Sequence, residues 1–250
     1  MSGKIQIEEK LNQVDVSPYV SVVVGNRTPS VQAWYHVAKD NLRTATLLLE
    51  NDVIPHAIFF FQQCVECLVK GTFLECGALN KETTRQINHS PEKAYKALYK
   101  KLDYMIGLDY CDKIPKLLSK AKSFEDKLII GANIGNKFTN KYWEDYNNAN
   151  LDALNTCYIN PTAMGLNPNS TPLQCHLRYL EATYAENMLL LLSCIFSQDV
   201  EQDVRYPKFF NNNVALPCEN FCNKTIKEGL QTIIPILETI INAIIGDSNI

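Results

Sequence analysis

Residues 55–77 read PHAIFFFQQCVECLVKGTFLECG, and nearly every position in them is apolar. A helix that is hydrophobic on almost all of its faces belongs in the interior of a protein. One polar line interrupts this stretch and consists of Gln62, Gln63, Glu66 and Lys70. Gln62, Glu66 and Lys70 follow at four-residue intervals and therefore share a helix face, on which Glu66 precedes Lys70 in the favourable orientation for an ion pair. The stretch predicts a central, buried helix with one polar stripe.

The composition is that of an ordinary globular protein. The chain has 250 residues, of which 46% are hydrophobic and 20% charged, so it is long enough to bury a core. Its net charge is −3, which gives no overall positive field to attract nucleic acid. Residues 1–13 lack the apolar segment of a signal peptide, and charged residues interrupt the apolar stretch 225–245. With nine scattered cysteines, we expect reduced thiols, a cytoplasmic location and no membrane contact.

Apolar side chains recur every three or four positions on both sides of the central stretch. Residues 30–50 form the first predicted helix, with Ser30 as its N-cap, and Pro55 near the start of the next helix makes the two an antiparallel hairpin. Further helices are predicted at residues 90–106, 114–130, 172–195 and 219–245. In the helix that begins at Pro172, Glu186 is predicted to be an outward charge.

Two segments have no clear helical pattern. Residues 1–29 contain short alternating and β-branched runs, which predict two short strands or an extended arm. Residues 131–170 are rich in Asn, Gly, Tyr and Thr, and they predict irregular or loosely helical surface structure. So long an irregular stretch is uncommon within a compact domain unless it is functional.

Three segments together resemble the HEPN superfamily of small helical-bundle domains. Residues 56–71 match the family's Gln-Gln-x-x-Glu-x-x-x-Lys helix with the polar stripe of the central stretch. His89 opens the next predicted helix, where the family has a Thr-His-Asp-Leu-like start and only the histidine matches. Arg205, Tyr206 and Pro207 are similar to an Arg-Tyr-Pro segment before the family's last helix.

The resemblance covers residues 30–107 and about 172–245. It implies an all-α fold, an up-and-down helical bundle of the HEPN type with an inserted segment and a short N-terminal arm. Residues 1–29 are then an N-terminal extension, and residues 30–250 are the helical domain, with the insertion at about 108–170.

The family is associated with nucleotide or nucleic-acid binding, with toxin–antitoxin and phage-defence systems, and with metal-independent RNA cleavage. Its ribonucleases carry an arginine and a histidine separated by four to six residues. None of the five arginines here meets that spacing; Arg85 and His89 come closest, with three residues between them. The resemblance therefore implies a non-catalytic nucleotide- or nucleic-acid-binding protein, a homodimer, and a nucleotidyltransferase as partner in a toxin–antitoxin setting.

The candidate ligand-binding residues are Gln62, Gln63, Glu66, Lys70, His89 and Arg205. Lys70 offers a point charge for a phosphate, and Arg205 can clamp a phosphate or carboxylate bidentately. The residues alone leave structural roles open for each. The stripe can be solvated or can bond internally and orient neighbouring helices. His89 can be a contact before a helix cap, and Arg205 can cap a helix C-terminus or pair with Asp203.

Two other functions stay open on the sequence. One is a metal-independent ribonuclease with a divergent site around Lys70, Arg85 and His89, and the other is a structural or protein-interaction module. No catalytic residue is assigned and no cofactor is predicted.

No metal site is predicted either. Cys64 and Cys67 form a CxxC inside the apolar helix, without the second pair that four-coordinate zinc requires. His56 is isolated on the same helix and is interpreted as a packing or surface residue.

Overall fold

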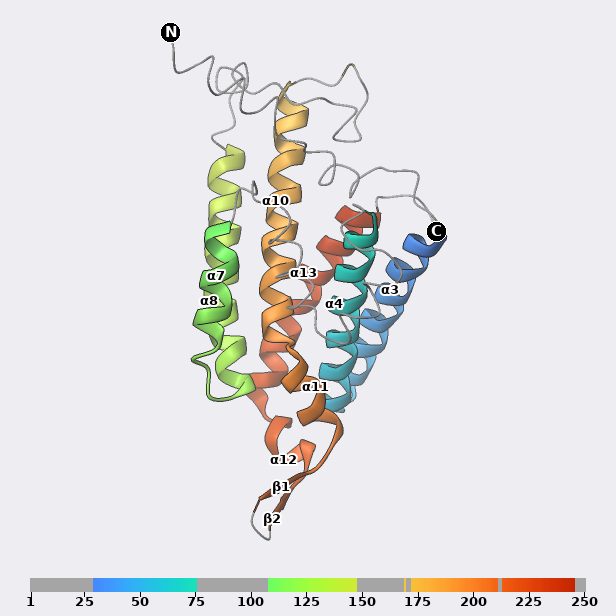
Figure 1. Ribbon diagram of the computed structural model, residues 1–250, viewed down its shortest axis with the longest axis vertical. Helices are drawn as coiled ribbons and strands as arrows, with labels where there is room; N and C mark the ends of the chain where they lie inside the picture. Colours follow the sequence, from blue (N-terminus) through green and yellow to red (C-terminus); the bar gives the residue numbers. More distant parts are fainter. Residues whose placement is uncertain (1–28, 76–107, 148–168, 170–171, 211–212, 246–250) are drawn as a thin grey trace.

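The computed structural model of the chain describes residues 29–75, 108–147, 169, 172–210 and 213–245 (Figure 1). Residues 1–28 of the predicted N-terminal extension, the predicted helix at 90–106 and His89 lie outside the described residues, whereas Pro29 is the first residue of a helix.

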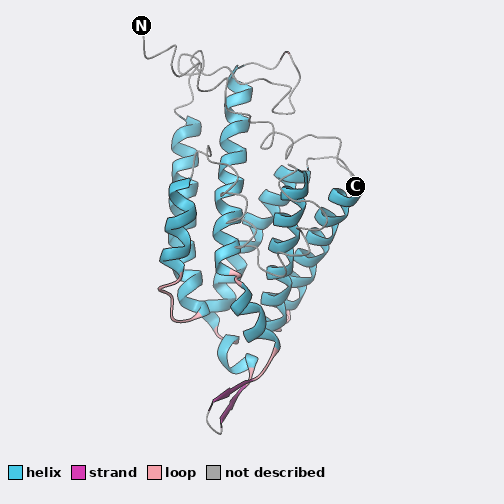
Figure 2. Cartoon of the chain, in the orientation of Figure 1, coloured by secondary structure: helices cyan, strands magenta, loops and turns pink. Residues whose placement is uncertain are grey.

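The described residues form an all-α bundle, as predicted, with one short β-hairpin at its lower end (Figures 1 and 2). In the hairpin the strands are antiparallel, with Lys208 opposite Ala215 and Phe210 opposite Asn213. The elements are α3 (Pro29–Glu50), α4 (Ile54–Glu75), α7 (Leu108–Leu118), α8 (Phe124–Asn147), α10 (Pro172–Ile195), α11 (Gln198–Arg205), β1 (Lys208–Phe210), β2 (Asn213–Ala215), α12 (Pro217–Phe221) and α13 (Lys224–Ile245).

Helix α4 is the buried helix that the apolar stretch predicts. Sixteen of its 22 residues are buried, and its most extensive contact is with α3. The turn between the two helices contains Asp52 at φ 59°, a left-handed conformation that Asp tolerates better than most residues. Helix α3 begins at Pro29, so Ser30 lies inside the helix and does not cap it. The buried apolar side chains of α3 recur at alternating intervals of four and three residues and face α4: Val31, Tyr35, Ala38, Leu42, Ala45 and Leu49.

Residues 131–147 correct the prediction of irregular or loosely helical structure, because they belong to the regular 24-residue helix α8. Gly131 and Gly135 are buried where α8 packs against α10. A Cβ on Gly135 would lie 3.3 Å from Cε of Met188, and one on Gly131 would lie closer still to Cδ1 of Ile195. The two glycines therefore let α10 approach α8. In the sequence, glycines indicate turns or loops, and their contribution to helix packing is not visible there.

Two predicted helices are each divided in two. Residues 114–130 span the end of α7 and the start of α8, where Ser123 Oγ accepts a hydrogen bond from the Asp126 N–H at 3.0 Å. Residues 219–245 span α12 and α13, where Asn223 Oδ1 accepts one from the Ile226 N–H at 2.8 Å. In both cases a side-chain cap inside an apolar run starts a new helix. Helix α10 begins at Pro172, as predicted.

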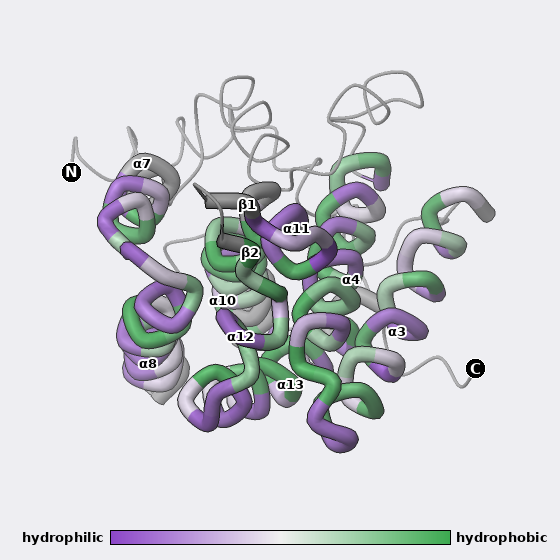
Figure 3. Tube along the Cα trace, turned by 90° about the horizontal axis from the view of Figure 1, so that it is seen from below, coloured by the Kyte–Doolittle hydropathy of each residue, from purple (hydrophilic) through white to green (hydrophobic). Residues whose placement is uncertain are grey.

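Four phenylalanine rings join the elements at the lower end. Phe196, which follows α10, lies 6.0 Å from Phe61 of α4 and 5.9 Å from Phe124 of α8, between ring centroids. Phe124 in turn lies 5.8 Å from Phe221 of α12. Viewed from below, α11, α12 and the hairpin lie across this end of the bundle beside α4 and α10 (Figure 3). The aromatic cluster thus holds the short elements against the start of α4.

Glu186 corrects a second prediction, because it is half-buried and not an outward charge. Burial raises the pKa of its carboxyl from 4.5 to about 8. Among the described helices, α4 alone is long and apolar enough to cross a membrane, but 78% of its most apolar window is covered by the rest of the protein. The core helix of a bundle has the same length and composition.

Candidate functional site

The polar stripe of α4 lies inside the bundle. Gln62, Glu66 and Lys70 are 0%, 4% and 7% exposed, which excludes a solvated stripe. Lys70 Nζ donates to Glu66 Oε1 at 2.5 Å. Gln63 Nε2 donates to Gln62 Oε1 at 2.6 Å and lies 3.5 Å from Glu66 Oε2. The four predicted residues therefore form one hydrogen-bonded chain along the helix.

Helix α3 closes over the Lys70 end of this chain. Lys70 Nζ lies 5.4 Å from the ring centroid of Trp34, a distance typical of a cation–π contact. Tyr35 Oη donates to Glu75 Oε2 at 2.5 Å. Gly71 allows this close approach, since a Cβ there would lie 2.7 Å from Cε1 of the buried Tyr35 ring. The charged pair is thus covered by the Trp34 ring of α3, and the Tyr35 ring packs against the next residue, Gly71.

A buried ion pair adds little to stability. Removing two charges from water is expensive, and their attraction often does no more than offset that cost. The Glu66–Lys70 pair is therefore better explained by specificity, for a helix arrangement or for a ligand, than by stability. The sequence leaves both explanations open. The contact of Lys70 with Trp34 of α3 supports the first, whereas the hydrogen bonds of the pair lie within α4 itself.

Arg205 is exposed at the end of α11 and packs on α4. Its guanidinium carbon lies 5.2 Å from the ring centroid of Phe59 and 5.3 Å from that of Tyr206. Asp203, the acid proposed as its partner, forms an ion pair with Lys208 at 2.5 Å. Phe59 precedes Gln63 by four residues and therefore lies on the same face of α4, one turn away. Two motifs that are far apart in the sequence thus meet along one face of one helix.

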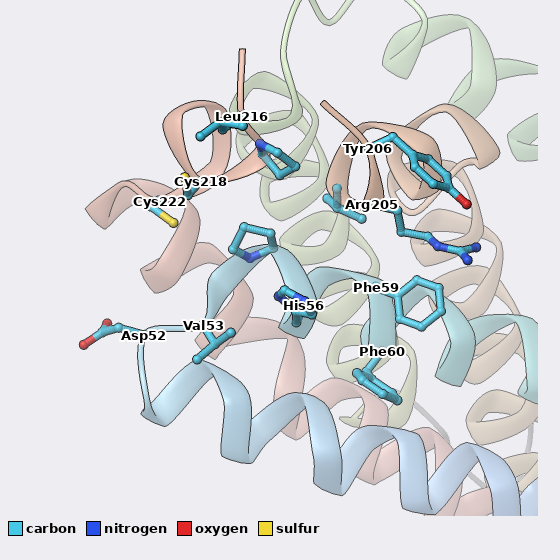
Figure 4. A pocket seen from close by; sticks show the side chains of 13 residues that line it. Asp52, Val53, His56, Phe59, Phe60, Arg205, Tyr206, Leu216, Cys218 and Cys222 are labelled. Carbon is cyan, nitrogen blue, oxygen red and sulfur yellow. The ribbon is translucent and has the colours of Figure 1, made fainter. Parts of the chain in front are cut away.

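A groove of about 860 Å³ opens beside Arg205 (Figure 4). The turn before α4, the first turns of α4, the end of α11 and α12 enclose it. Asp52 at one edge forms an ion pair with Lys227 at 2.5 Å. The lining is mostly apolar and aromatic: Asp52, Val53, Pro55, His56, Phe59, Phe60, Val204, Arg205, Tyr206, Leu216, Pro217, Cys218 and Cys222.

The sequence did not reveal this groove. His56, for which the sequence leaves packing and surface roles open, is exposed as a surface residue, and its side chain also lines the groove. The signals available in the sequence were the run of aromatic residues at the start of α4 and, far from it, the Arg-Tyr-Pro segment, which only the fold brings together. His89, the sixth predicted ligand-binding residue, lies outside the described residues.

The cysteines of α4 are buried thiols. Burial raises the pKa of Cys64 far above its ordinary value and that of Cys67 to about 12, so both stay protonated near neutral pH. Within the described part of the chain, no group of three or more His, Cys, Asp or Glu side chains is placed to hold a metal ion.

The family comparison agrees with the resemblance over residues 30–107 and does not extend to residues 172–245. Residues 31–106 match the HEPN domain family. The matched segment, a little under a third of the chain, begins with α3 and α4 and includes the whole polar stripe and His89, but not Arg205. A HEPN domain suggests a role related to nucleotides or RNA. No curated protein and no solved structure matches the chain.

Proposed function

We propose that the protein binds a nucleotide or a nucleic acid without cleaving it. The proposed site is the face of α4 that carries the polar stripe and against which Arg205 of α11 packs. The observation that carries this proposal is the contact between Arg205 and Phe59, one helical turn from Gln63. In its support, Arg205 is a cation that suits phosphate, and the helical turn after Phe59 carries Gln63, which is half-buried.

Arg205 has the chemistry for the phosphate. A guanidinium presents a planar fork of N–H donors that matches two phosphate oxygens, and stacking on aromatic rings holds its plane. The rings of Phe59 and Tyr206 provide that stacking.

Gln63 and the buried pair supply orientation. The Nε2 group of Gln63 bonds to Gln62 and approaches Glu66, which fixes the orientation of its amide. A fixed amide can distinguish donors from acceptors on a base edge. In this proposal the Glu66–Lys70 pair holds the helix face in shape, and contact with the ligand occurs at the Gln63–Arg205 end.

The setting that we propose is a cytoplasmic toxin–antitoxin or phage-defence system, in which the protein is a homodimer and a nucleotidyltransferase is its partner. The family resemblance supports this setting, and Arg85 and His89 do not have the spacing of the family's ribonuclease motif. Co-purification with a nucleotidyltransferase encoded beside it, and sedimentation as a dimer at micromolar concentration, are the expected results. The setting would be contradicted if the protein sedimented as a monomer and no nucleotidyltransferase co-purified with it.

The binding proposal is tested by fluorescence anisotropy with labelled single-stranded RNA and, separately, with nucleotide competitors. Arg205→Ala should raise the dissociation constant about tenfold to a hundredfold, the usual effect of losing charge-assisted hydrogen bonds. Arg43→Ala is the matched control, because Arg43 is exposed on α3 and lies nine residues, or half a helical rotation, from Trp34.

Three results would contradict the proposal. If neither RNA nor nucleotides bind, the binding proposal is wrong. If Arg205→Ala and Arg43→Ala weaken RNA affinity equally, the attraction is non-specific. The RNA recovered after incubation should be intact on a gel; cleavage by the wild-type protein that is lost in His89→Ala would favour the ribonuclease.

A further inference from the structure

The groove beside Arg205 is larger and more apolar than phosphate binding requires. Its volume of about 860 Å³ lies within the range of small-molecule sites. Tyr206, Leu216 and Val53 around it are 57%, 45% and 37% exposed. Apolar and aromatic side chains that cluster at the surface around a hollow mark a binding site.

We propose that this groove holds one base of the ligand, stacked on Tyr206, while the phosphate of the same nucleotide lies at Arg205. The inference rests on the proposed function and specifies how that function is carried out. The ligand chemistry is an aromatic base joined to a phosphate, which comes either from a free nucleotide or from an unpaired base in a single strand.

The aromatic side chains of the groove provide the stacking surfaces. Phe59 and Phe60 are half-buried on α4 and meet edge to face, with ring centroids 5.3 Å apart. Tyr206 projects from the end of α11 beside Arg205 and Phe59 (Figure 4). Stacking on an aromatic side chain accepts any base, because every base has a π face.

The charges around the groove favour an anionic ligand. Asp52, the acid in the lining, is already paired with Lys227, which offsets its charge. Arg205 brings a positive charge to the lining. The groove is bordered both by the N-terminus of α4 and by the C-terminus of α11, whose partial charges are opposite, so the attraction for an anion is assigned to Arg205. The combination of a cation with aromatic walls distinguishes this groove from a purely apolar docking surface.

The test uses the full chain and 2-aminopurine, a fluorescent base whose emission falls when it stacks. One arm uses single-stranded RNA with one central 2-aminopurine, and the other uses 2-aminopurine riboside monophosphate. An end label on the same RNA reports binding by anisotropy, independently of stacking. Quenching in both arms identifies a mononucleotide site, whereas quenching with RNA alone identifies an unpaired base of a strand; either result supports the groove.

Tyr206→Leu should abolish the quenching and raise the dissociation constant about fivefold to a hundredfold, the usual effect of losing one base–aromatic stack. Tyr206→Trp should keep both quenching and affinity. Trp143→Leu is the control, because Trp143 is an aromatic residue of similar exposure (51%) on α8, which does not line the groove.

The outcomes separate this inference from the proposed function. Binding without quenching, unchanged in Tyr206→Leu, overturns the stacking site and leaves the proposed function standing. Absence of binding to any probe overturns both. If sedimentation shows a dimer that Tyr206→Leu dissociates while RNA binding is unchanged, a second copy of the chain occupies the groove and the inference is wrong.

Discussion

The polar stripe and the groove both involve α4, but they differ in their exposure to solvent and in their hydrogen bonding. Gln62, Glu66 and Lys70 are buried and are bonded within their own helix. Tyr206 and Leu216 are exposed around a hollow, beside an arginine held on aromatic rings. The most recognisable residues of α4 therefore need not be those that touch a ligand. Substitutions at the buried residues of the stripe should change stability, and those in the groove should change binding.

The largest expected effect is that of Lys70→Met. The substitution leaves the Glu66 carboxylate buried without the partner that lies 2.5 Å away. Breaking a buried ion pair in this way reduces the free energy of unfolding by about 3–5 kcal/mol. Urea unfolding at pH 7 measures it.

The double variant Glu66→Gln/Lys70→Met is the control for that experiment. It removes both charges together, so most of the lost stability should return. A change below about 0.5 kcal/mol in the single variant, the range of ordinary surface substitutions, would mean that the pair is not a buried one.

A smaller loss is expected for Gly71→Ala. The added Cβ would lie 2.7 Å from the buried Tyr35 ring, which cannot move aside easily. Overpacking of about 1–3 kcal/mol, reduced by the roughly 1 kcal/mol that Ala gains over Gly in a helix, leaves a net loss of about 1 kcal/mol. Gly135→Ala meets the flexible Met188 instead and should be neutral or stabilising. Equal changes in the melting temperature of Gly71→Ala and Gly135→Ala would show that α3 and α4 are not packed so closely.

The raised pKa of Glu186, which lies outside both the stripe and the groove, should make the free energy of unfolding depend on pH. Between its ordinary pKa of 4.5 and its raised pKa of about 8, the folded protein holds a proton that the unfolded chain has released. The free energy of unfolding should therefore fall as the pH rises through this window. Glu186→Gln should remove that part of the slope when urea midpoints are compared from pH 5 to pH 8. Parallel curves for the two proteins would contradict the burial of this carboxyl.

The smallest effect on stability is expected in the groove. Tyr206→Leu should change the free energy of unfolding by less than about 0.5 kcal/mol, since 57% of the Tyr206 side chain is exposed. Thermal unfolding of the free protein measures this. A large loss would mean that Tyr206 holds the fold together and would weaken its assignment to a ligand.

The central helix was predictable because its signal is local. An unbroken apolar stretch with a polar line at four-residue intervals determines both a buried helix and which polar residues share a face. The C-terminal part of helix α8 was not predictable in this way. Gly131 and Gly135 let α10 pack closely because they lack a side chain, and the sequence pattern does not show such a contribution. The helix caps at Ser123 and Asn223 could not be predicted either, because a single polar residue inside an apolar run does not indicate the start of a new helix.

The groove depends on contacts between distant segments. His56, Arg205 and Leu216 come from three elements that only the tertiary fold brings together. The sequence identified Arg205 through its motif but could not place it on Phe59, because the path of α11 is set by the aromatic cluster around Phe196. The polar residues that share one face of α4 could thus be predicted from their spacing, whereas the groove could not.

The central claim is that Arg205 and Phe59 act together on a ligand, and a double-mutant cycle on RNA affinity tests it most directly. Phe59→Leu, Arg205→Ala and the double variant are compared with the wild-type protein by anisotropy. Residues in contact are expected to couple by about 0.5 kcal/mol or more, so the double variant should bind less weakly than the two single losses predict together. Strictly additive losses, or no loss in Arg205→Ala, would contradict the claim that the two motifs form one site.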